Sequence, residues 1–124
     1  MRFSVFGGAD VVYRSFEDLE VWKRACKLAV SVYELTKEWK DYGLKNQMER
    51  CSVSIASNIA EGSERGGKDF VRFLRIASGS AAELRTQLYI AKKIGLIEDP
   101  LFQELLFEAK GVSKMLTGLI KSLN

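Results

Sequence analysis

Apolar residues recur three and four positions apart along most of the chain after residue 14. A period near 3.6 residues puts them on one face of an α-helix, whereas a half-buried strand would alternate at every second position. Proline, which breaks helix interiors, occurs once in 124 residues, at Pro100. The pattern therefore predicts long amphipathic helices, each of which must bury its apolar face against another.

Four helical segments are predicted, with short connections between them. They cover roughly residues 15–40, 44–61, 68–94 and 99–124. The first should end at Tyr42-Gly43 and the third at Gly95, because glycine adopts the left-handed conformation that closes many helices. Asp99 is predicted to cap the fourth segment, with Pro100 at its first helical position. Helices on short connections run antiparallel, so residues 15–124 are predicted to form an all-α, antiparallel up-down four-helix bundle.

Each predicted helix has an apolar stripe that we expect to face the bundle core. In the first segment the stripe is Leu19, Trp22, Cys26, Ala29, Tyr33 and Thr36. The second has Leu44, Met48, Cys51, Ile55 and Ile59, and the third has Leu74, Ala77, Ala81, Leu84, Leu88 and Ala91. The fourth keeps a heptad of Phe102, Leu105, Ala109, Val112, Leu116, Leu119 and Leu123.

Residues 1–14 do not continue the helical pattern. The stretches FSVF and VVY flank GGAD, which is typical of a short extended hairpin or of a disordered arm. An isolated hairpin is only marginally stable in water. We therefore expect an N-terminal arm over residues 1–14, extended or disordered, ahead of a single bundle domain at 15–124.

Several functional classes are disfavoured by what the chain lacks. It has no histidine, and Cys26 and Cys51 form no CxxC motif, so no Ser-His, Cys-His or zinc-binding pattern is present. We expect free thiols, no catalytic residue, no metal and no cofactor. No apolar run reaches the ~18 residues of a membrane helix, and the N-terminus has no signal-peptide core. We therefore expect a cytoplasmic protein with no membrane partner.

The stretch SIASNIAEGSERGGKDF, residues 54–70, combines polar residues at helical spacing with a glycine-rich loop. Its end fits the GxxxxGK phosphate-loop pattern, but it follows a helix, and Asp69 stands where Ser or Thr would hold magnesium. A helix end and a flexible link are the better interpretation. Asn58 and Glu61 share one helix face. The two residues fit a buried polar network that fixes how the helices meet. The alternative is that Glu61 is a catalytic carboxylate, which would need a second acid or base nearby, and the sequence offers no obvious one.

Three glycines lie inside the predicted helices, at Gly79, Gly111 and Gly118. Each costs roughly 1 kcal/mol relative to alanine in a helix interior, so a compensating gain is expected. Either the glycines allow tight packing within one chain, or one of these flat faces meets another subunit. Together with the large aromatic residues of the chain, they lead us to expect an oligomer.

Basic residues outnumber acidic ones between positions 65 and 93, where only Asp69 and Glu83 are acidic. The net charge of +3 is mild, but this local excess suits phosphate backbones, particularly when an oligomer repeats it. A merely solvated helix surface is the alternative. No stacking aromatics are apparent, so we expect recognition of shape and charge rather than of bases. The candidate nucleic-acid contacts are Arg65, Lys68, Arg72, Arg75, Lys92 and Lys93.

Three motifs resemble those of a known family. FEDLEVWKRA at residues 16–25 is similar to the family's opening, SIASNIAEG at 54–62 to its SIxSNIAEG motif, and FLRIASGSAAEL at 73–84 to its FLxxAxGSxxEL motif. The chain thereby resembles the bacterial four-helix bundle proteins, also called 23S rRNA intervening-sequence proteins, from residue 16 to its C-terminus. The resemblance implies a homo-oligomeric ring, often a pentamer. It also implies kinship with the accessory protein of diversity-generating retroelements, which works with a reverse transcriptase and its RNA.

The resemblance further implies that polar and small residues of these motifs lie where the second and third helices meet. They are Asn58, Glu61, Gly62, Gly79, Ser80 and Glu83. Two functions remain open. One is a non-enzymatic homo-oligomer that associates with structured RNA or DNA through its basic helical face. The other is a protein–protein scaffold or accessory factor, for example for a reverse transcriptase, without direct nucleic-acid contact.

Overall fold

A computed structural model describes residues 15–124 in full and the backbone of residues 3–5 and 11–13. Two three-residue strands, β1 (Phe3–Val5) and β2 (Val11–Tyr13), pair antiparallel with Phe3 opposite Tyr13. The predicted arm thus contains paired extended segments, and the rest of the arm lies outside the described residues.

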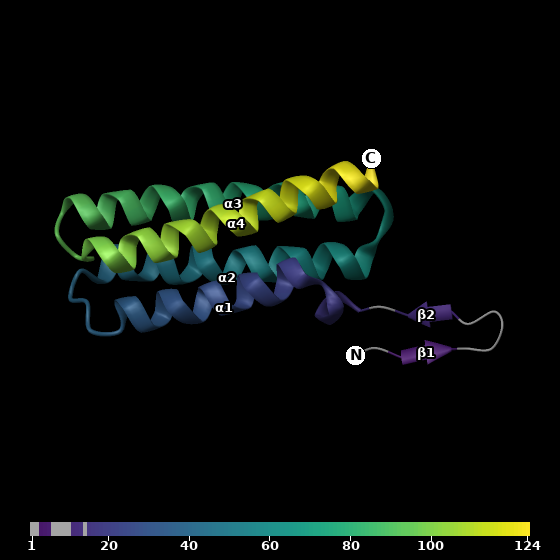
Figure 1. The fold of residues 1–124 in the computed structure, drawn as a ribbon, viewed down its shortest axis with the longest axis horizontal. Helices are drawn as coiled ribbons and strands as arrows, with labels where there is room; N and C mark the ends of the chain where they lie inside the picture. The colour runs from purple at the N-terminus through teal and green to yellow at the C-terminus, as the bar shows by residue number, and fades with distance from the viewer. Residues whose placement is uncertain (1–2, 6–10, 14) are drawn as a thin grey trace.

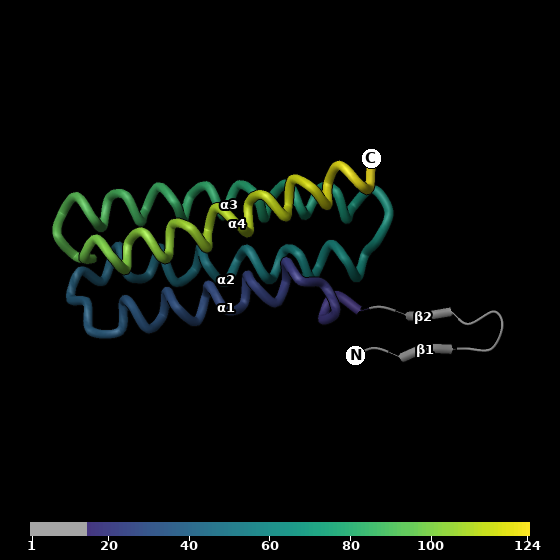
Figure 2. The backbone as a smooth tube through the Cα atoms, in the orientation of Figure 1, coloured from purple at the N-terminus to yellow at the C-terminus, as the bar shows by residue number. Residues whose placement is uncertain are grey.

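The described chain continues into four long helices. A short 3-10 helix, η1 (Phe16–Asp18), precedes α1 (Glu20–Thr36), α2 (Tyr42–Arg65), α3 (Gly67–Lys93) and α4 (Asp99–Leu123). Figures 1 and 2 show the α1–α2 and α3–α4 connections at one end and the α2–α3 turn at the other. Both α1 and α3 pack on α2 and α4, so the predicted up-down four-helix bundle is confirmed.

The connection between the first two helices lies earlier than predicted. α1 ends at Thr36, and Tyr42-Gly43 begin α2 instead of closing the first helix. The cause is Asp41, whose Oδ1 accepts a hydrogen bond from the Leu44 N–H at 3.1 Å and so caps α2.

The α3–α4 connection is close to the prediction. Gly95, with a φ of 83°, follows α3 and donates its N–H to the Lys92 carbonyl, as expected at a left-handed helix terminus. The N-cap of α4 is Glu98 rather than Asp99. Asp99 instead accepts a hydrogen bond from the Lys92 side chain, and this contact lowers the pKa of the Asp99 carboxyl.

The core lies between the four helices and is almost entirely apolar. The predicted stripes of α2, α3 and α4 face it, except that Leu44 and Leu119 are only half-buried and Leu123, in the last turn, is exposed. No helix within residues 15–124 is both long and apolar enough to cross a membrane.

α1 turns a different face to the core from the predicted one. Its buried residues are Val21, Ala25, Leu28, Ala29, Val32 and Thr36. Tyr33 is exposed, and Trp22 and Cys26 are half-buried on the side toward the outside of α2. The helix therefore carries two adjacent apolar stripes that share Ala29 and Thr36. Periodicity alone does not say which stripe faces inward, and it favoured the wrong one.

The turn between α2 and α3 is made by two glycines in the left-handed conformation. Gly66 and Gly67 have φ values of 71° and 57°, so the predicted helix stop is present, although α2 continues through Gly62 before reaching it. Gly62 lies directly against α3. A Cβ at this position would lie 2.6 Å from the Phe73 Cβ and 3.3 Å from the Phe70 carbonyl oxygen, so glycine permits the close approach of the two helices.

Candidate nucleic-acid interface

Arg65 and Arg72 lie near the α2–α3 turn and form a small network of ion pairs. Arg65 pairs with Glu61 at 3.2 Å and with Asp69 at 3.5 Å, and Arg72 pairs with Asp69 at 3.5 Å. Both guanidinium groups also lie over the Phe73 ring, 5.1 and 4.7 Å from its centroid. Because acidic neighbours offset their charge, these arginines are weaker candidates for phosphate contacts than the sequence alone suggests.

Arg75 and Lys121 line a groove between α3 and α4. The groove has a volume of about 500 Å³, and Ser78, Thr117 and Asn124 supply its other polar groups. Lys68 lines a neighbouring groove between the start of α3 and the end of α4. All three cations are exposed, and none forms a salt bridge with an acidic residue of the described chain.

The other two candidate lysines lie at the far end of α3. Lys93 is 18 residues from Arg75, which corresponds to about 27 Å along a helix. Lys92 pairs with Asp99, and its Nζ lies 4.9 Å from the centroid of the Phe102 ring. The structure thus separates the six predicted contacts into two groups, one from the end of α2 into the first turns of α3 and one at the far end of α3. The members without an ion pair are Lys68, Arg75 and Lys93.

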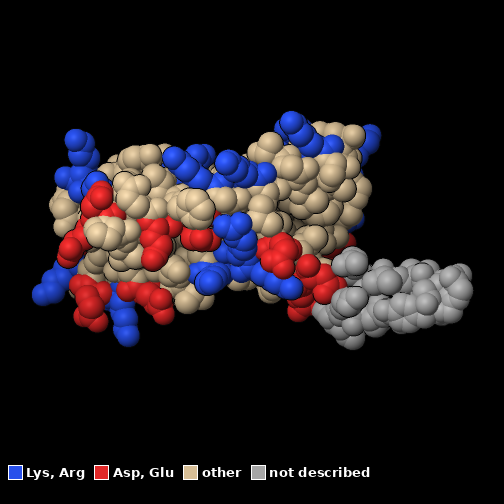
Figure 3. Space-filling view, viewed as in Figure 1, with Lys and Arg blue, Asp and Glu red and all other residues tan. Residues whose placement is uncertain are grey.

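Three lysines of α4, which we did not single out from the sequence, add positive charge on the helix whose Lys121 lies beside Arg75. Lys110, Lys114 and Lys121 are exposed and share one face of α4, because they are four and seven residues apart. The signal was present in the sequence, since residues 109–124 contain these lysines and no acidic residue. Figure 3 shows Lys and Arg side chains along the edge formed by α3 and α4. We call Lys68, Arg75, Lys93, Lys110, Lys114 and Lys121 the α3–α4 basic surface.

A hydrogen-bonded network joins α2 and α3 within the family-like motifs. The hydroxyls of Ser54 and Ser80 lie 3.0 Å apart, and Asn58 Nδ2 donates to both the carbonyl and the hydroxyl oxygen of Ser54. The Cys51 thiol donates to the Ser80 carbonyl at 3.0 Å. Ser80 thus lies where the second and third helices meet, in hydrogen-bond contact with Ser54 and Cys51, whereas Asn58 bonds to Ser54 of its own helix.

Other residues of the motifs lie outside this network. Glu61 is exposed and pairs with Arg65 of its own helix, not with an arginine of another helix. Gly79 is also exposed, and a Cβ there would meet no atom within 4 Å, so tight packing within the chain does not explain this glycine. The same is true of Gly118, whereas a Cβ at Gly111 would lie 2.5 Å from Arg24 Nη2.

The titratable groups near the motifs offer little reactive chemistry. Burial raises the pKa of the Cys51 thiol to about 12, and the negative charge of Glu83 adds to the shift. Burial also raises the pKa of the Cys26 thiol, and both cysteines are free. Within residues 15–124, no three His, Cys, Asp or Glu side chains are grouped so that they could hold a metal ion.

α1 and α2 carry a second apolar surface on the outside of the bundle. Two shallow pockets of about 540 and 400 Å³ run along it and share Ala29 and Val53. Val30, Tyr33 and Val53 are exposed there. Contiguous apolar patches of this kind are typical of interaction sites. We call Trp22, Cys26, Ala29, Val30, Tyr33, Val53, Ala56 and Ala60 the outer apolar face.

Residues 17–118 match the family model described as 23S rRNA-intervening sequence protein. Among solved structures, a Bacteroides thetaiotaomicron protein of unknown function from the S23 ribosomal protein family has a similar fold, with a TM-score of 0.77. It is 24% identical in sequence, and the match covers 82% of this chain and 98% of that one. A search of curated proteins gave no match. Because the family match spans most of the chain and agrees with the motifs, the chain belongs to the 23S rRNA-intervening sequence protein family.

Proposed function

We propose that this protein is a non-enzymatic homo-oligomer that associates with nucleic acid, and with RNA in particular, through the α3–α4 basic surface. The observation that carries the proposal is the charge of that surface. Its six cations are exposed, and none pairs with an acidic residue among those the structure describes. The family description, which names an intervening sequence of 23S rRNA, supports RNA as the partner.

Unpaired surface cations bind phosphate backbones chiefly because they release condensed counterions. Each phosphate contact therefore adds to the salt dependence of binding, while contributing little sequence preference. An assembly that repeats the surface would strengthen the local field and the avidity together.

The outer apolar face supports the oligomeric part of the proposal. Its named residues are apolar apart from the Tyr33 hydroxyl and Cys26 thiol, and the charged residues Glu34, Lys37, Lys45 and Glu49 also line one of its two pockets. An interface with an apolar centre and a polar rim is the usual arrangement between protein subunits. The sequence resemblance to ring-forming proteins suggests a pentamer. Light scattering of the purified protein would measure the mass of the assembly and so the number of subunits.

The test of the basic surface is the double variant Arg75→Glu/Lys121→Glu, compared with wild type in a salt titration of RNA binding. We expect weaker binding and a log–log salt slope smaller by about 2, because two phosphate contacts are removed. Lys27→Glu/Lys40→Glu, which makes the same charge change at exposed positions on α1 and in the α1–α2 connection, is the matched control. Equal losses in both variants would indicate a nonspecific charge effect, and unchanged binding in Arg75→Glu/Lys121→Glu would overturn the assignment.

A protein scaffold is the second candidate function, and the outer apolar face is the observation that favours it. In that case the face would bind a partner protein, such as a reverse transcriptase, and affinity would depend weakly on salt. The absorbance ratio at 260 and 280 nm of the protein purified at low salt distinguishes the two. Nucleic acid that co-purifies and is removed by high salt supports the first function, and a clean protein supports the second.

A further inference from the structure

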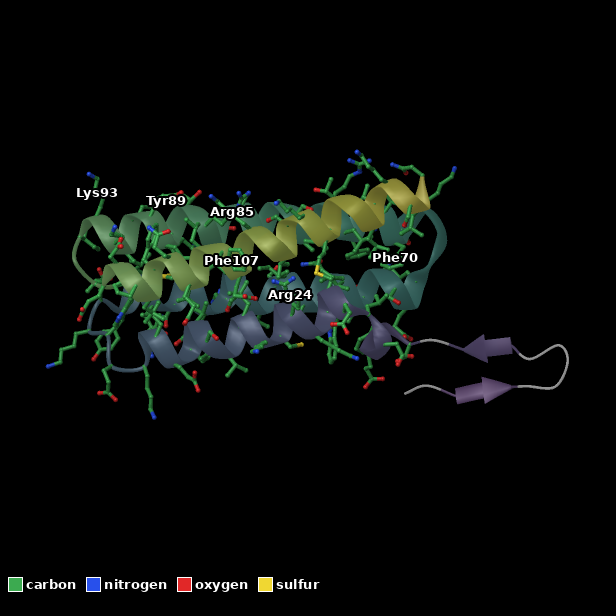
Figure 4. All side chains as sticks on the ribbon, viewed as in Figure 1. Arg24, Phe70, Arg85, Tyr89, Lys93 and Phe107 are labelled. Carbon is green, nitrogen blue, oxygen red and sulfur yellow. The ribbon has the colours of Figure 1, made fainter. Side chains whose placement is uncertain are left out.

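Two aromatic side chains of α3 and α4 are exposed beside the α3–α4 basic surface. Phe107 has 71% of its surface accessible to solvent, the largest fraction among the exposed large apolar residues of positions 15–124, and Tyr89 has 51%. Figure 4 shows Tyr89, Arg85 and Lys93 along α3 and Phe107 on the neighbouring helix α4. From the sequence we expected no stacking aromatics, because periodicity cannot show which aromatic residues stay outside the core.

Each of these aromatics has cations one helical turn away. Tyr89 lies four residues from both Arg85 and Lys93, and residues four apart share a helix face about 6 Å apart. Arg85 is half-buried and forms no salt bridge within residues 15–124, and its Nε, which is buried, has no hydrogen-bond partner there. The positive charge beside Tyr89 is therefore not offset by an ion pair.

Phe107 has the same arrangement on α4. Lys110 and Lys114 follow it by three and seven residues, so both lie along the face on which the ring stands. Acidic residues lie on the other side of Phe107. Glu108 among them turns toward α1, where it pairs with Arg24 at 3.1 Å. The side of Phe107 toward Lys110 is thus the one suited to an anionic ligand.

The Tyr89 ring is held in place before any ligand binds. It packs edge-to-face on Phe102, with ring centroids 5.2 Å apart and an angle of 67° between the planes. Lys92 lies over that same Phe102 ring, and this second contact further restricts the movement of Phe102. An exposed aromatic ring that is already ordered loses little conformational entropy when a base stacks on it.

We infer that this part of the α3–α4 surface binds single-stranded nucleic acid, with unpaired bases stacking on Phe107 and Tyr89. Arg85, Lys93, Lys110 and Lys114 contact the phosphates between them. Aromatic rings alternating with cations are the means by which proteins bind single strands with little sequence preference. A duplex keeps its bases stacked on each other and offers these rings nothing to bind. The inference rests on the proposed function and specifies its ligand: unpaired segments of RNA or DNA, such as loops and ends.

The test measures fluorescence anisotropy of the full chain with a labelled unstructured uridine oligonucleotide and with a labelled RNA duplex of equal length. We expect Phe107→Ala and Tyr89→Ala each to weaken single-strand binding by about 5- to 150-fold, the range found when a stacking residue is removed. Duplex binding should stay at the wild-type level. Phe107→Trp, unlike Phe107→Ala, should keep single-strand binding near the wild-type level, because the larger ring still stacks on a base. Tyr42→Ala, an equally drastic change at an exposed tyrosine of α2, is the matched control and should change neither.

The outcomes separate this inference from the proposed function. If the alanine variants bind the single strand as wild type does while Arg75→Glu/Lys121→Glu binds weakly, stacking is wrong and the basic surface stands. If wild type binds neither nucleic acid, both ideas fail. If Phe107→Ala changes the oligomeric mass measured by light scattering, Phe107 is a subunit contact and the inference is overturned.

Discussion

Small residues determine how closely the second and third helices approach each other. Gly62 lies under Phe73, and Ser80 takes part in hydrogen bonds to both Ser54 and Cys51 of the facing helix. A larger side chain at Gly62 or Ser80 would push against the facing backbone or leave a buried polar group without its partner. Helix packing therefore accounts for Ser54 and Gly62 of the SIASNIAEG motif, whereas Glu61 is exposed and pairs with Arg65 of its own helix.

The two kinds of helical glycine should respond oppositely to alanine. We expect Gly62→Ala to destabilise the fold by about 1–3 kcal/mol, because its Cβ would overlap Phe73 and crowd the Phe70 carbonyl. Gly118→Ala should stabilise the isolated fold by up to about 1 kcal/mol, since nothing lies within 4 Å and alanine favours the helix. Urea unfolding of both variants measures this, and a Gly62→Ala protein as stable as wild type would contradict the close contact.

The Cys51 thiol should make the free energy of unfolding decrease as the pH rises into the alkaline range. Its pKa is raised from 9.0 to about 12 in the folded state, so the unfolded chain releases the proton first and the folded state keeps it. The stabilising contribution is therefore complete below pH 9 and is lost as the pH rises from about 9 toward 12. Denaturant unfolding at several alkaline pH values should show a steeper loss of stability in wild type than in Cys51→Ala. Parallel curves would count against this role.

At the scale of single elements, α3 was predicted from the sequence most completely and α1 least. Every stripe residue predicted for α3 is fully buried. Its exposed large apolar residues, Ile76, Tyr89 and Ile90, are scattered among charged and small residues and form no second stripe along the helix. α1 instead has apolar residues over more than half of its circumference. Val21, Leu28 and Val32 face the core, while Trp22 and Tyr33 lie on the outer apolar face. A helix that is apolar over so much of its circumference normally packs against other elements on both apolar sides. The sequence of one chain does not show which of the two sides packs inside that chain.

A charge placed on the outer apolar face should dissociate the proposed homo-oligomer without unfolding the chain. Val30→Glu/Val53→Glu changes two exposed residues, so we expect the helical circular dichroism of wild type together with a lower mass in light scattering. Ile76→Glu, an exposed aliphatic residue of α3 away from this face, is the control and should keep the wild-type mass. An unchanged oligomeric mass in the double variant would show that this face is not the interface of the proposed oligomer.

At the scale of the whole molecule, the bundle was predictable, but the candidate interface was only partly so. Sequence counting identifies the basic excess of residues 65–93, yet it cannot show that Asp69 offsets two of its arginines or that Asp99 offsets Lys92. Nor can it show that antiparallel packing brings Lys121 of α4 beside Arg75. Helix packing decides which charged residues lie next to each other, so the α3–α4 basic surface is defined by the structure and not by the composition.

The up-down order also leaves one seam of the bundle, between α1 and α4, without a connecting turn. It is the least extensive of the helix–helix contacts, and α1, with 17 residues, is the shortest of the four helices. Arg24 crosses this seam to Glu108 and to the Met115 sulfur, above the space left by Gly111. Native-state stability is thus unevenly distributed. The free energy that protects α1 amides from hydrogen exchange should be smaller than that of global unfolding, because α1 can detach while the other three helices keep their mutual contacts.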